Sequence, residues 1–262
     1  MNPSKLKVRE IEEYLRENPE LTREIYHALL EDPRRGVKSL LRKWQEKRAR
    51  DRQEEERLQK MLLLEEEYRG RGYRLIAGVD EAGRGPLAGP VVAAAVILPQ
   101  GLKIRGVDDS KKLTPGKREE LYSAIKEKSL AVGLGVVEPP EIDEINIYRA
   151  GLKAFALAVG ALGLKPDFIL TDAFPVPGTA IPQFALVRGD ALSLSIAAAS
   201  IVAKVTRDAI MDELDQKYPG YGLGQHKGYP TRDHREALKK YGPSPCHRLS
   251  FELLGAEEEA LP

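Results

Sequence analysis

The sequence predicts an α/β protein in which helices cover a central mixed sheet, preceded by a small all-helical extension. Near residues 70–72 the composition changes from charged helix formers to stretches rich in Val, Ile, Ala and Gly. Beyond that point short apolar stretches alternate with longer helical patterns, as expected for helices packed on a sheet. The first two strand-like stretches follow each other with no helix between them, which argues against a purely parallel sheet.

The first part of the chain is expected to be helical throughout. Apolar residues recur at helical spacing over residues 6–15. A second helix is expected from a Thr22 cap to Leu30, and a third over residues 37–68. Residues 34–60 hold roughly twice as many basic as acidic side chains, so this helix either binds phosphate groups or is a solvated face with i,i+4 ion pairs.

The second part combines five expected strands with four expected helices. Strands are assigned to short runs of β-branched and other apolar residues, and helices to longer stretches with capping signals. Thr114 caps one helix with Pro115 in its first turn, and another helix is expected to divide near Asn146. In chain order the elements are strands at 74–79 and 91–98, a helix at 114–128, a strand at 131–137, a helix at 140–162, strands at 167–171 and 184–187, and helices at 191–218 and 232–241.

Composition excludes several classes of protein. Among 262 residues, 41 Lys and Arg nearly balance 40 Asp and Glu, so the net charge of +1 gives no global sign of nucleic-acid binding. The single cysteine, Cys246, excludes an internal disulfide and a cysteine-based zinc cluster. No apolar run reaches the roughly 18–20 residues that span a bilayer, and the start lacks the apolar core of a signal peptide. We therefore expect a cytoplasmic protein.

Acidic side chains stand where strands end or a helix begins. Asp80 and Glu81 follow the first strand, Asp172 ends the fourth, and Asp190 precedes the long helix. Functional sites gather at strand ends in open sheets. Carboxylates brought together repel one another unless a cation lies between them, and oxygen donors suit Mg²⁺ or Mn²⁺. The four residues are therefore candidate metal ligands.

Each of these carboxylates also has a purely structural interpretation. Asp190 can simply cap the helix that begins at residue 191. Asp172 can be a turn residue. Asp80 and Glu81 face opposite ways on an ideal strand, so they share one metal site only if the strand ends or twists between them.

The glycine-rich segment after the first strand favours close approach of a ligand to the backbone. Gly83, Gly85 and Gly89 have the spacing G-x-G-x-x-x-G, which differs from a dinucleotide-binding fingerprint, and Pro86 stands where a helix would open. Arg84 between the glycines is suited to pairing with phosphate. The alternative is a tight turn without a ligand.

Two further segments carry groups suited to binding a nucleic-acid strand. Ser110 and Lys111 offer a hydroxyl and a cation, and Lys227 and Tyr229 combine a cation with an aromatic ring on a glycine-rich loop. The alternative for the second segment is an ordinary surface loop. The histidines in this part of the chain show no metal-ligand spacing; they are His226, His234 and His247.

From about residue 75 to 251 the chain resembles ribonuclease HII, the type 2 ribonuclease H family. The motifs that carry the resemblance are residues 78–85 with 88–92, 109–111, 144–147, Asp172, 188–190, 198–208, 226–229 and 247–248. The resemblance implies a ribonuclease H-like fold, a mixed sheet flanked by helices. It also implies an endonuclease that cleaves the RNA strand of RNA–DNA hybrids and nicks duplex DNA 5′ to embedded ribonucleotides, as in ribonucleotide excision repair.

The resemblance also implies roles for individual residues. The metal-binding carboxylates are Asp80, Glu81, Asp172 and Asp190, which hold two Mg²⁺ or Mn²⁺ ions for an in-line hydrolysis that leaves a 3′-OH and a 5′-phosphate. Asp80 is expected to bridge both metals and Asp190 to serve the metal on the water side. The backbone of residues 83–85 is expected to contact the ribonucleotide 2′-OH. Tyr229 is expected to lie against the sugar at the RNA–DNA junction.

The change in composition and the family resemblance together predict the domain organisation. Residues 1–70 are expected to be a helical extension and possible nucleic-acid-binding adjunct, residues 73–254 the catalytic domain, and residues 255–262 a tail. The protein is expected to act as a monomer without a membrane partner. The residues also leave two other hypotheses open, a non-catalytic nucleic-acid-binding adaptor and a nucleotide-cofactor enzyme.

Overall fold

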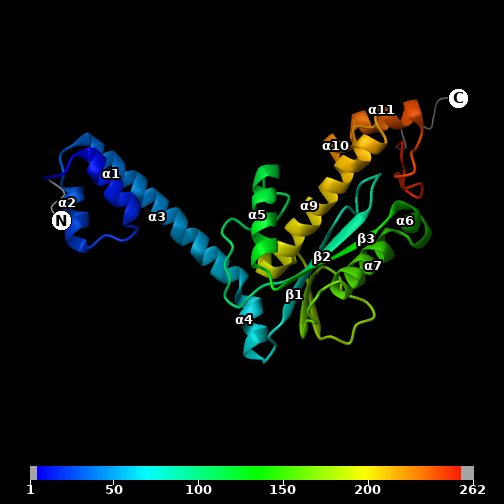
Figure 1. Ribbon diagram of the computed structural model, residues 1–262, viewed down its shortest axis with the longest axis horizontal. Helices are drawn as coiled ribbons and strands as arrows, with labels where there is room; N and C mark the ends of the chain where they lie inside the picture. The colour runs from blue at the N-terminus through cyan, green and yellow to red at the C-terminus, as the bar shows by residue number, and fades with distance from the viewer. Residues whose placement is uncertain (1–4, 255–262) are drawn as a thin grey trace. The chain divides into compact units, whose positions relative to one another are not determined.

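The computed structural model describes residues 5–254, and its chain divides into two compact units, one ending at Arg57 and one beginning at Leu58 (Figure 1). The tail expected at residues 255–262 lies outside the described residues. No described helix is both long and apolar enough to cross a membrane.

The N-terminal unit is built from helices, as expected. Helix α1 spans Val8–Glu17, α2 spans Arg23–Leu30, and α3 spans Arg35–Met61 and continues into the second unit. Thr22 caps α2 by accepting a hydrogen bond from the Ile25 N–H at 3.4 Å. Apolar side chains at helical spacing form the core of this unit, namely Ile11, Leu15, Leu29, Val37 and Leu41.

The single helix expected at residues 37–68 is two helices in the structure. After α3, a tight turn at Leu62 leads into α4, Leu63–Gly70. The Leu62 N–H donates to the carbonyls of both Leu58 and Gln59, and this shared bond closes one helix and opens the next. Periodicity alone does not reveal such a break, since the apolar spacing continues through it.

The second unit contains a five-stranded mixed sheet in the order β3-β2-β1-β4-β5. The strands are β1 Ile76–Ala82, β2 Val91–Ile97, β3 Ala131–Val137, β4 Phe168–Asp172 and β5 Gln183–Leu186. Strand β1 pairs antiparallel with β2 and parallel with β4, and β4 pairs parallel with β5. The mixed sheet expected from the sequence is confirmed.

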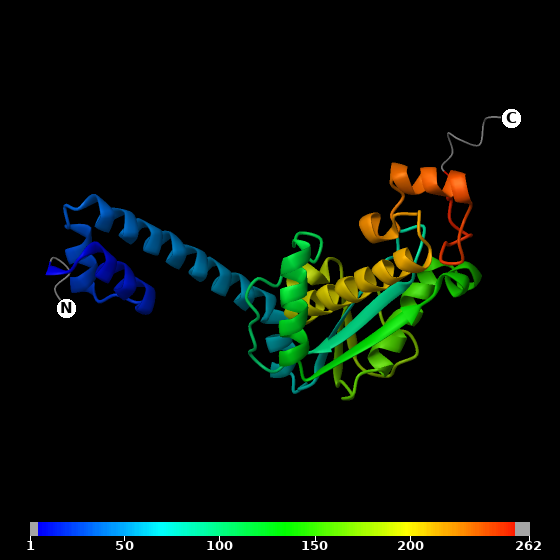
Figure 2. The ribbon, with the colours of Figure 1, turned by 45° about the horizontal axis from the view of Figure 1, so that its top comes forward.

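Helices cover both faces of the sheet (Figures 1 and 2). One face packs against α5, Pro115–Lys128, and α9, Leu194–Lys217; the other packs against α6, Pro139–Ile145, and α7, Ile147–Gly160. Strand β2 is buried on both faces, which explains its unbroken apolar run. Two further helices follow α9 in the chain, the short α10 at Leu223–His226 and α11 at Arg232–Tyr241.

Glycines allow the long helices to lie directly on the strands. A Cβ on Gly78 in β1 would lie 2.1 Å from the carbonyl carbon of Ser195 in α9. A Cβ on Gly135 in β3 would lie 2.1 Å from the carbonyl oxygen of Ala154 in α7. Backbone-to-backbone packing of this kind leaves no room for any side chain at these two strand positions.

The start of the long helix differs from the expected position. A four-residue helix, α8 at Gly189–Leu192, comes first, and α9 then begins with Ser193 as its cap. The Ser193 hydroxyl oxygen accepts from the Ile196 N–H at 3.2 Å, so the interpretation of Asp190 as the cap of the long helix is wrong. Ser193 also donates to the buried carboxylate of Glu65 at 2.7 Å, and this carboxylate accepts a second bond from the Ser195 N–H.

The boundary between the two units lies after Arg57 in the structure, earlier in the chain than the change in composition near residue 70. Leu58, Met61 and Leu62 lie in the same apolar cluster as β2 and α9, and Tyr68 packs with Ile76 of β1. The last turn of α3 and all of α4 therefore belong to the unit that contains the sheet. The composition boundary at residue 70 marks where strands begin, because a helix packed against a sheet can still carry a charged outer face.

Candidate active site

The candidate carboxylates lie at one edge of the sheet. Strands β1 and β4 run parallel, with Val79 opposite Thr171, so their carboxyl ends reach the same edge. Asp80 and Glu81 are near the end of β1, and Asp172 is the last residue of β4. Asp190 lies in α8, which directly follows β5 at that edge. The fold thus gathers side chains that are about a hundred residues apart in the sequence.

Strand β1 does not end between Asp80 and Glu81. It stays paired with β2 through Ala82, so the two side chains alternate across the sheet. Asp80 lies on the side of α9, where it accepts a hydrogen bond from Ser200. Glu81 lies on the other side, with its Oε1 3.5 Å from the Arg84 guanidinium.

Burial and mutual repulsion act together on these acids. Asp80 and Asp190 are only 5% and 8% exposed. Burial raises the pKa of Asp80 well above its usual range, and the charges of Glu81 and Asp172 raise it further. Burial also raises the pKa of Glu81 and of Asp190, and the charge of Asp172 contributes to both. Three of the four carboxylates are therefore costly to ionise without a nearby positive charge.

The loop before α5 reaches this edge. The Ser110 hydroxyl is 3.0 Å from the Ser200 hydroxyl, which links the loop to Asp80. The positive charge of Lys111 acts on both Glu81 and Asp190, where it opposes the rise in pKa. Asp109 also acts on Asp190 and raises its pKa. Asp109 belongs to one of the motifs that carry the family resemblance, but its residue type alone does not predict this role.

The glycine-rich segment and Tyr229 lie side by side, although they are far apart in the sequence. A Cβ on Gly85 would lie 3.9 Å from the Tyr229 ring, which is 44% exposed. The Arg84 guanidinium lies 5.0 Å from the centre of the Phe174 ring and turns toward Glu81. The structure therefore brings two of the substrate-binding candidates, Gly85 and Tyr229, together on one surface.

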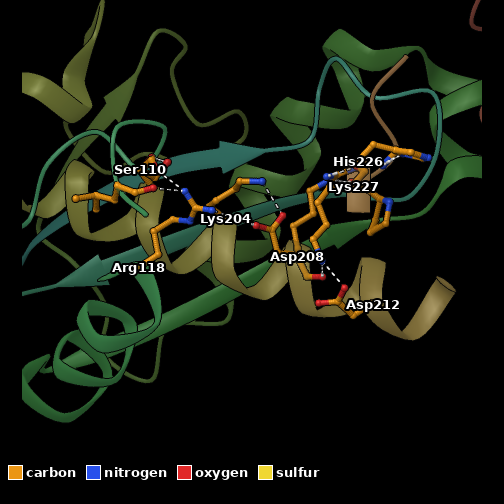
Figure 3. A network of polar contacts seen from close by, with 12 residues as sticks. Ser110, Arg118, Lys204, Asp208, Asp212, His226 and Lys227 are labelled. Carbon is orange, nitrogen blue, oxygen red and sulfur yellow. Dashed lines mark hydrogen bonds and ion pairs between the residues drawn. The ribbon is translucent and has the colours of Figure 1, made fainter. Parts of the chain in front are cut away.

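Lys227 is engaged within the protein. Its ammonium group pairs with Asp212 and donates to the Asp208 carbonyl at 3.3 Å (Figure 3). Asp208 in turn pairs with Lys204 at 2.6 Å and lies 3.9 Å from Arg118. These side chains line a cavity of about 340 Å³ between α5, α9 and α10.

Sequence reasoning missed two buried arginines behind the glycine-rich segment. Arg207 is 1% exposed and Arg248 is 0% exposed. Both lie in motifs used for the family resemblance, but an arginine in a sequence gives no sign of whether it is buried. Burial lowers the pKa of Arg248 to about 9, which leaves its guanidinium charged at neutral pH.

The carboxylate edge fits a divalent cation by its chemistry. Its candidate donors are all oxygen atoms, and positive charge among them would offset the burial and the repulsion that raise the pKa values of Asp80, Glu81 and Asp190. Within residues 5–254 no three acidic, histidine or cysteine side chains lie close enough together to form a ligand set. Metal binding by Asp80, Glu81, Asp172 and Asp190 therefore stays a prediction.

Comparison with known proteins identifies the family. A family profile described as Ribonuclease HII matches residues 77–254, more than half of the chain. The chain belongs to the ribonuclease HII family. A second profile, described as Ribonuclease HII N-terminal domain, matches residues 7–69. This member of the ribonuclease HII family is thus a ribonuclease H, an endonuclease, and the hypotheses of a non-catalytic adaptor and of a nucleotide-cofactor enzyme are wrong.

Close relatives carry the same family name. Ribonuclease HII from Acetivibrio thermocellus is 54% identical over 82% of this chain and 84% of its own length. Ribonuclease HII from Geobacillus kaustophilus is 50% identical over 89% of this chain and 91% of its own length.

Solved structures share the fold of the sheet-containing unit. Ribonuclease H2 from Pyrococcus horikoshii has a TM-score of 0.59 and 34% identity, and covers 68% of this chain and 94% of its own. A ribonuclease HII from Archaeoglobus fulgidus, solved in complex with PCNA, has a TM-score of 0.59 and 30% identity over 71% of this chain and all of its own. A ribonuclease HIII structure with Mn²⁺ is 21% identical with a TM-score of 0.55, and it supports the fold alone.

Proposed function

We propose that this ribonuclease HII cleaves the RNA strand of RNA–DNA hybrids and nicks duplex DNA 5′ to embedded ribonucleotides, leaving a 3′-OH and a 5′-phosphate. The observation that carries this proposal is the group of acids at the carboxyl edge of β1 and β4, whose charges raise one another's pKa, next to the exposed Gly85 and the exposed Tyr229. Its proposed substrate partners are an RNA–DNA hybrid and a DNA duplex that contains ribonucleotides, and we propose that it acts on them as a cytoplasmic monomer.

Asp80, Glu81, Asp172 and Asp190 are the residues that would hold two Mg²⁺ or Mn²⁺ ions. Asp80 and Glu81 leave β1 on opposite faces, but the charge of Asp172 acts on both of them at the end of the strand. Such ions supply a water of lowered pKa and neutralise charge on the scissile phosphate. The chain itself contributes the placement of the acids: Ser200 orients Asp80 by a hydrogen bond, and the Gly189 N–H donates to the Asp172 Oδ1 at 2.7 Å. Lys111 adds a positive charge that lowers the energetic cost of ionising Glu81 and Asp190.

Substrate selection is assigned to the surface beside the acids. The backbone of Gly83, Arg84 and Gly85 meets the sugar of the ribonucleotide, whose 2′-OH is the one group that distinguishes it from its DNA neighbours. The exposed ring of Tyr229 contacts the sugar on the 3′ side of the cut. Ser110, as part of the loop joined to Asp80, helps to position the scissile phosphate.

The main test replaces Asp80 with Asn. Asp80→Asn should abolish cleavage of a duplex that carries a single ribonucleotide, assayed by product mapping in Mg²⁺, Mn²⁺ or EDTA. The pKa of Asp80 is raised in the folded protein, so its charge opposes folding at neutral pH, and the variant should melt no lower than wild type in EDTA. Asp233→Asn makes the same chemical change at an exposed position on α11 and should cleave normally. Normal turnover by Asp80→Asn, or cleavage in EDTA, would contradict the proposal.

The N-terminal unit is proposed to bind the phosphate backbone of the substrate. Residues 34–52 contain nine basic and two acidic side chains. A cavity of about 1050 Å³ within this unit is lined by three arginines, two aromatic rings and two acids, namely Arg23, Arg48, Arg52, Tyr26, Trp44, Glu20 and Asp51. The Arg48 guanidinium lies 5.0 Å from the centre of the Trp44 ring, a contact that orders it before any ligand binds.

Paired substitutions on α3 test this role in the full chain. The double variant Arg48→Ala with Arg52→Ala should raise the substrate KM several-fold and flatten its salt dependence, with kcat unchanged. The double variant Lys47→Ala with Arg50→Ala removes the same charge from residues that do not line the cavity, and should have a smaller effect. Equal KM values and equal salt slopes for both pairs would assign the cavity no role in binding.

A further inference from the structure

Arg248 holds the glycine-rich segment from the inside. Its Nε donates to the Gly89 carbonyl at 3.0 Å, and its Nη2 donates to the carbonyls of Gly83 at 2.6 Å and Gly89 at 2.7 Å. Its Nη1 donates to the carbonyls of Arg84 at 3.1 Å and Pro86 at 2.7 Å. A single side chain with no exposed surface thus binds the backbone at both ends of the segment.

Arg207 on α9 holds the far end of the same segment. Its guanidinium donates to the carbonyls of Ala88 and Pro90, each at 3.0 Å, and to the Lys227 carbonyl at 3.0 Å. A Cβ on Gly83 would lie 2.1 Å from the Arg207 Nε, so the segment rests directly on this side chain. Because the Lys227 carbonyl is bound as well, Arg207 connects the segment to the loop that carries Tyr229.

Neither arginine forms an ion pair with a carboxylate in the part of the chain that the structure describes. Burying a guanidinium is costly, and here the cost is offset mainly by hydrogen bonds to backbone carbonyls, with a contribution from the more distant charges of Asp143 on Arg248 and of Asp208 on Arg207. Arginine suits this role because its planar group presents five N–H donors in a fixed arrangement, whereas lysine presents three on a flexible stem.

The carbonyls of the glycine-rich segment point toward the arginines, so its N–H groups on the opposite side of the backbone stay available for a ligand. Among the described residues, the N–H groups of Gly83, Arg84 and Gly85 donate to no backbone or side-chain acceptor. Gly85, the exposed residue of the three, lies beside the exposed ring of Tyr229, on the surface assigned above to the ribonucleotide sugar. A segment without side chains at positions 83 and 85 would be too mobile to hold such donors unless its carbonyls were fixed.

We propose that Arg248, assisted by Arg207, is a positioning residue for substrate selection. The two guanidinium groups fix the backbone of residues 83–90 so that its free N–H groups meet the 2′-hydroxyl of a ribonucleotide. This inference rests on the proposed function. It assigns the preference for ribonucleotides to side chains that do not touch the substrate.

The test measures binding preference in a protein that does not cut. In the full-length Asp80→Asn background, the Kd is measured for two duplexes of one sequence, one all-DNA and one with a single ribonucleotide. Arg248→Lys should reduce the preference for the ribonucleotide duplex by roughly tenfold, the value of one or two hydrogen bonds, and leave the Kd for the all-DNA duplex unchanged. A general loss of structure would weaken binding to both duplexes equally, and that result would overturn the proposal.

Two further variants complete the experiment. Arg235→Lys is the matched control, since Arg235 also donates to a backbone carbonyl, that of Leu253, but does not contact the segment; it should keep the full preference. If circular dichroism shows that Arg248→Lys is unfolded, Arg207→Lys replaces it and should show the same selective loss. Unchanged preference in a folded Arg248→Lys or Arg207→Lys protein would refute the positioning role. The proposed function fails separately, if the wild-type chain neither cuts at the ribonucleotide nor distinguishes the two duplexes.

Discussion

Three histidines that show no metal-ligand spacing form one group near Tyr229, joined by a ring stack and a hydrogen bond. The rings of His226 and His234 stack at 4.3 Å, and the Nε2 atoms of His234 and His247 are 3.0 Å apart. The Tyr229 carbonyl can only accept, so His234 carries its proton on Nδ1, 2.9 Å away. His247 must then donate from Nε2 and accept on Nδ1 from the Ser244 N–H at 3.0 Å. This chain of bonds requires His234 and His247 to be neutral.

At the residue scale, the neutral form of His247 predicts that the folded protein loses stability in acid. Burial, with a smaller contribution from His234, lowers the pKa of His247 from 6.5 to about 4. Between these values the unfolded chain binds a proton that the folded chain does not, so stability is complete above pH 6.5 and decreases as the pH falls toward 4. The expected loss in unfolding free energy is on the order of a few kcal/mol.

Urea unfolding between pH 7.5 and 4 checks this prediction. His247→Gln should be less stable than wild type at neutral pH, because it loses a well-packed ring, but its stability should depend less on pH. His27→Gln changes an exposed histidine and should keep the wild-type dependence. Identical pH dependence for wild type and His247→Gln would show that His247 ionises equally in both states.

At the scale of elements, close contact between helix and strand is the main constraint. Gly135→Ala in β3 would place a Cβ 2.1 Å from the Ala154 carbonyl oxygen and 2.7 Å from the Ala158 nitrogen, both backbone atoms of α7. Because neither atom can move alone, the variant should lose about 1–3 kcal/mol or more in unfolding free energy. Gly160→Ala, at the end of the same helix, meets nothing within 4 Å and should be neutral or slightly stabilising. Equal melting temperatures for the two variants would contradict this account of the packing.

At the scale of the whole molecule, the boundary between the two units is testable by truncation. A chain that begins at Leu58 should fold cooperatively, because it keeps Leu58, Met61 and Leu62 in the core and Glu65 at the start of α9. A chain that begins at residue 71, the boundary suggested by composition, loses these groups. It should melt at a much lower temperature or fail to fold, as measured by circular dichroism. If both truncated chains had the same stability, α4 would be dispensable to the sheet-containing unit.

The sequence alone was sufficient for the type and order of nearly all elements. Apolar periodicity and caps such as Thr22 and Thr114 are local signals, and the structure confirms the helices and strands they predict. The motifs 78–85 and 198–208 were also sufficient to indicate the family, since they combine residue types whose spacing is specific. The candidate carboxylates were found in the same way, because charged residues at strand ends have no role in an apolar core.

Only the tertiary structure decided how those residues face one another. Whether β1 continues past Asp80, and hence which face each acid takes, depends on pairing with β2 and β4. The burial of Arg207 and Arg248 depends on carbonyls that lie far away in the sequence. The division of the chain after Arg57 depends on which side chains fill the core beneath α9. Each of these features is a contact between distant segments, and local patterns of a sequence carry no information about such contacts.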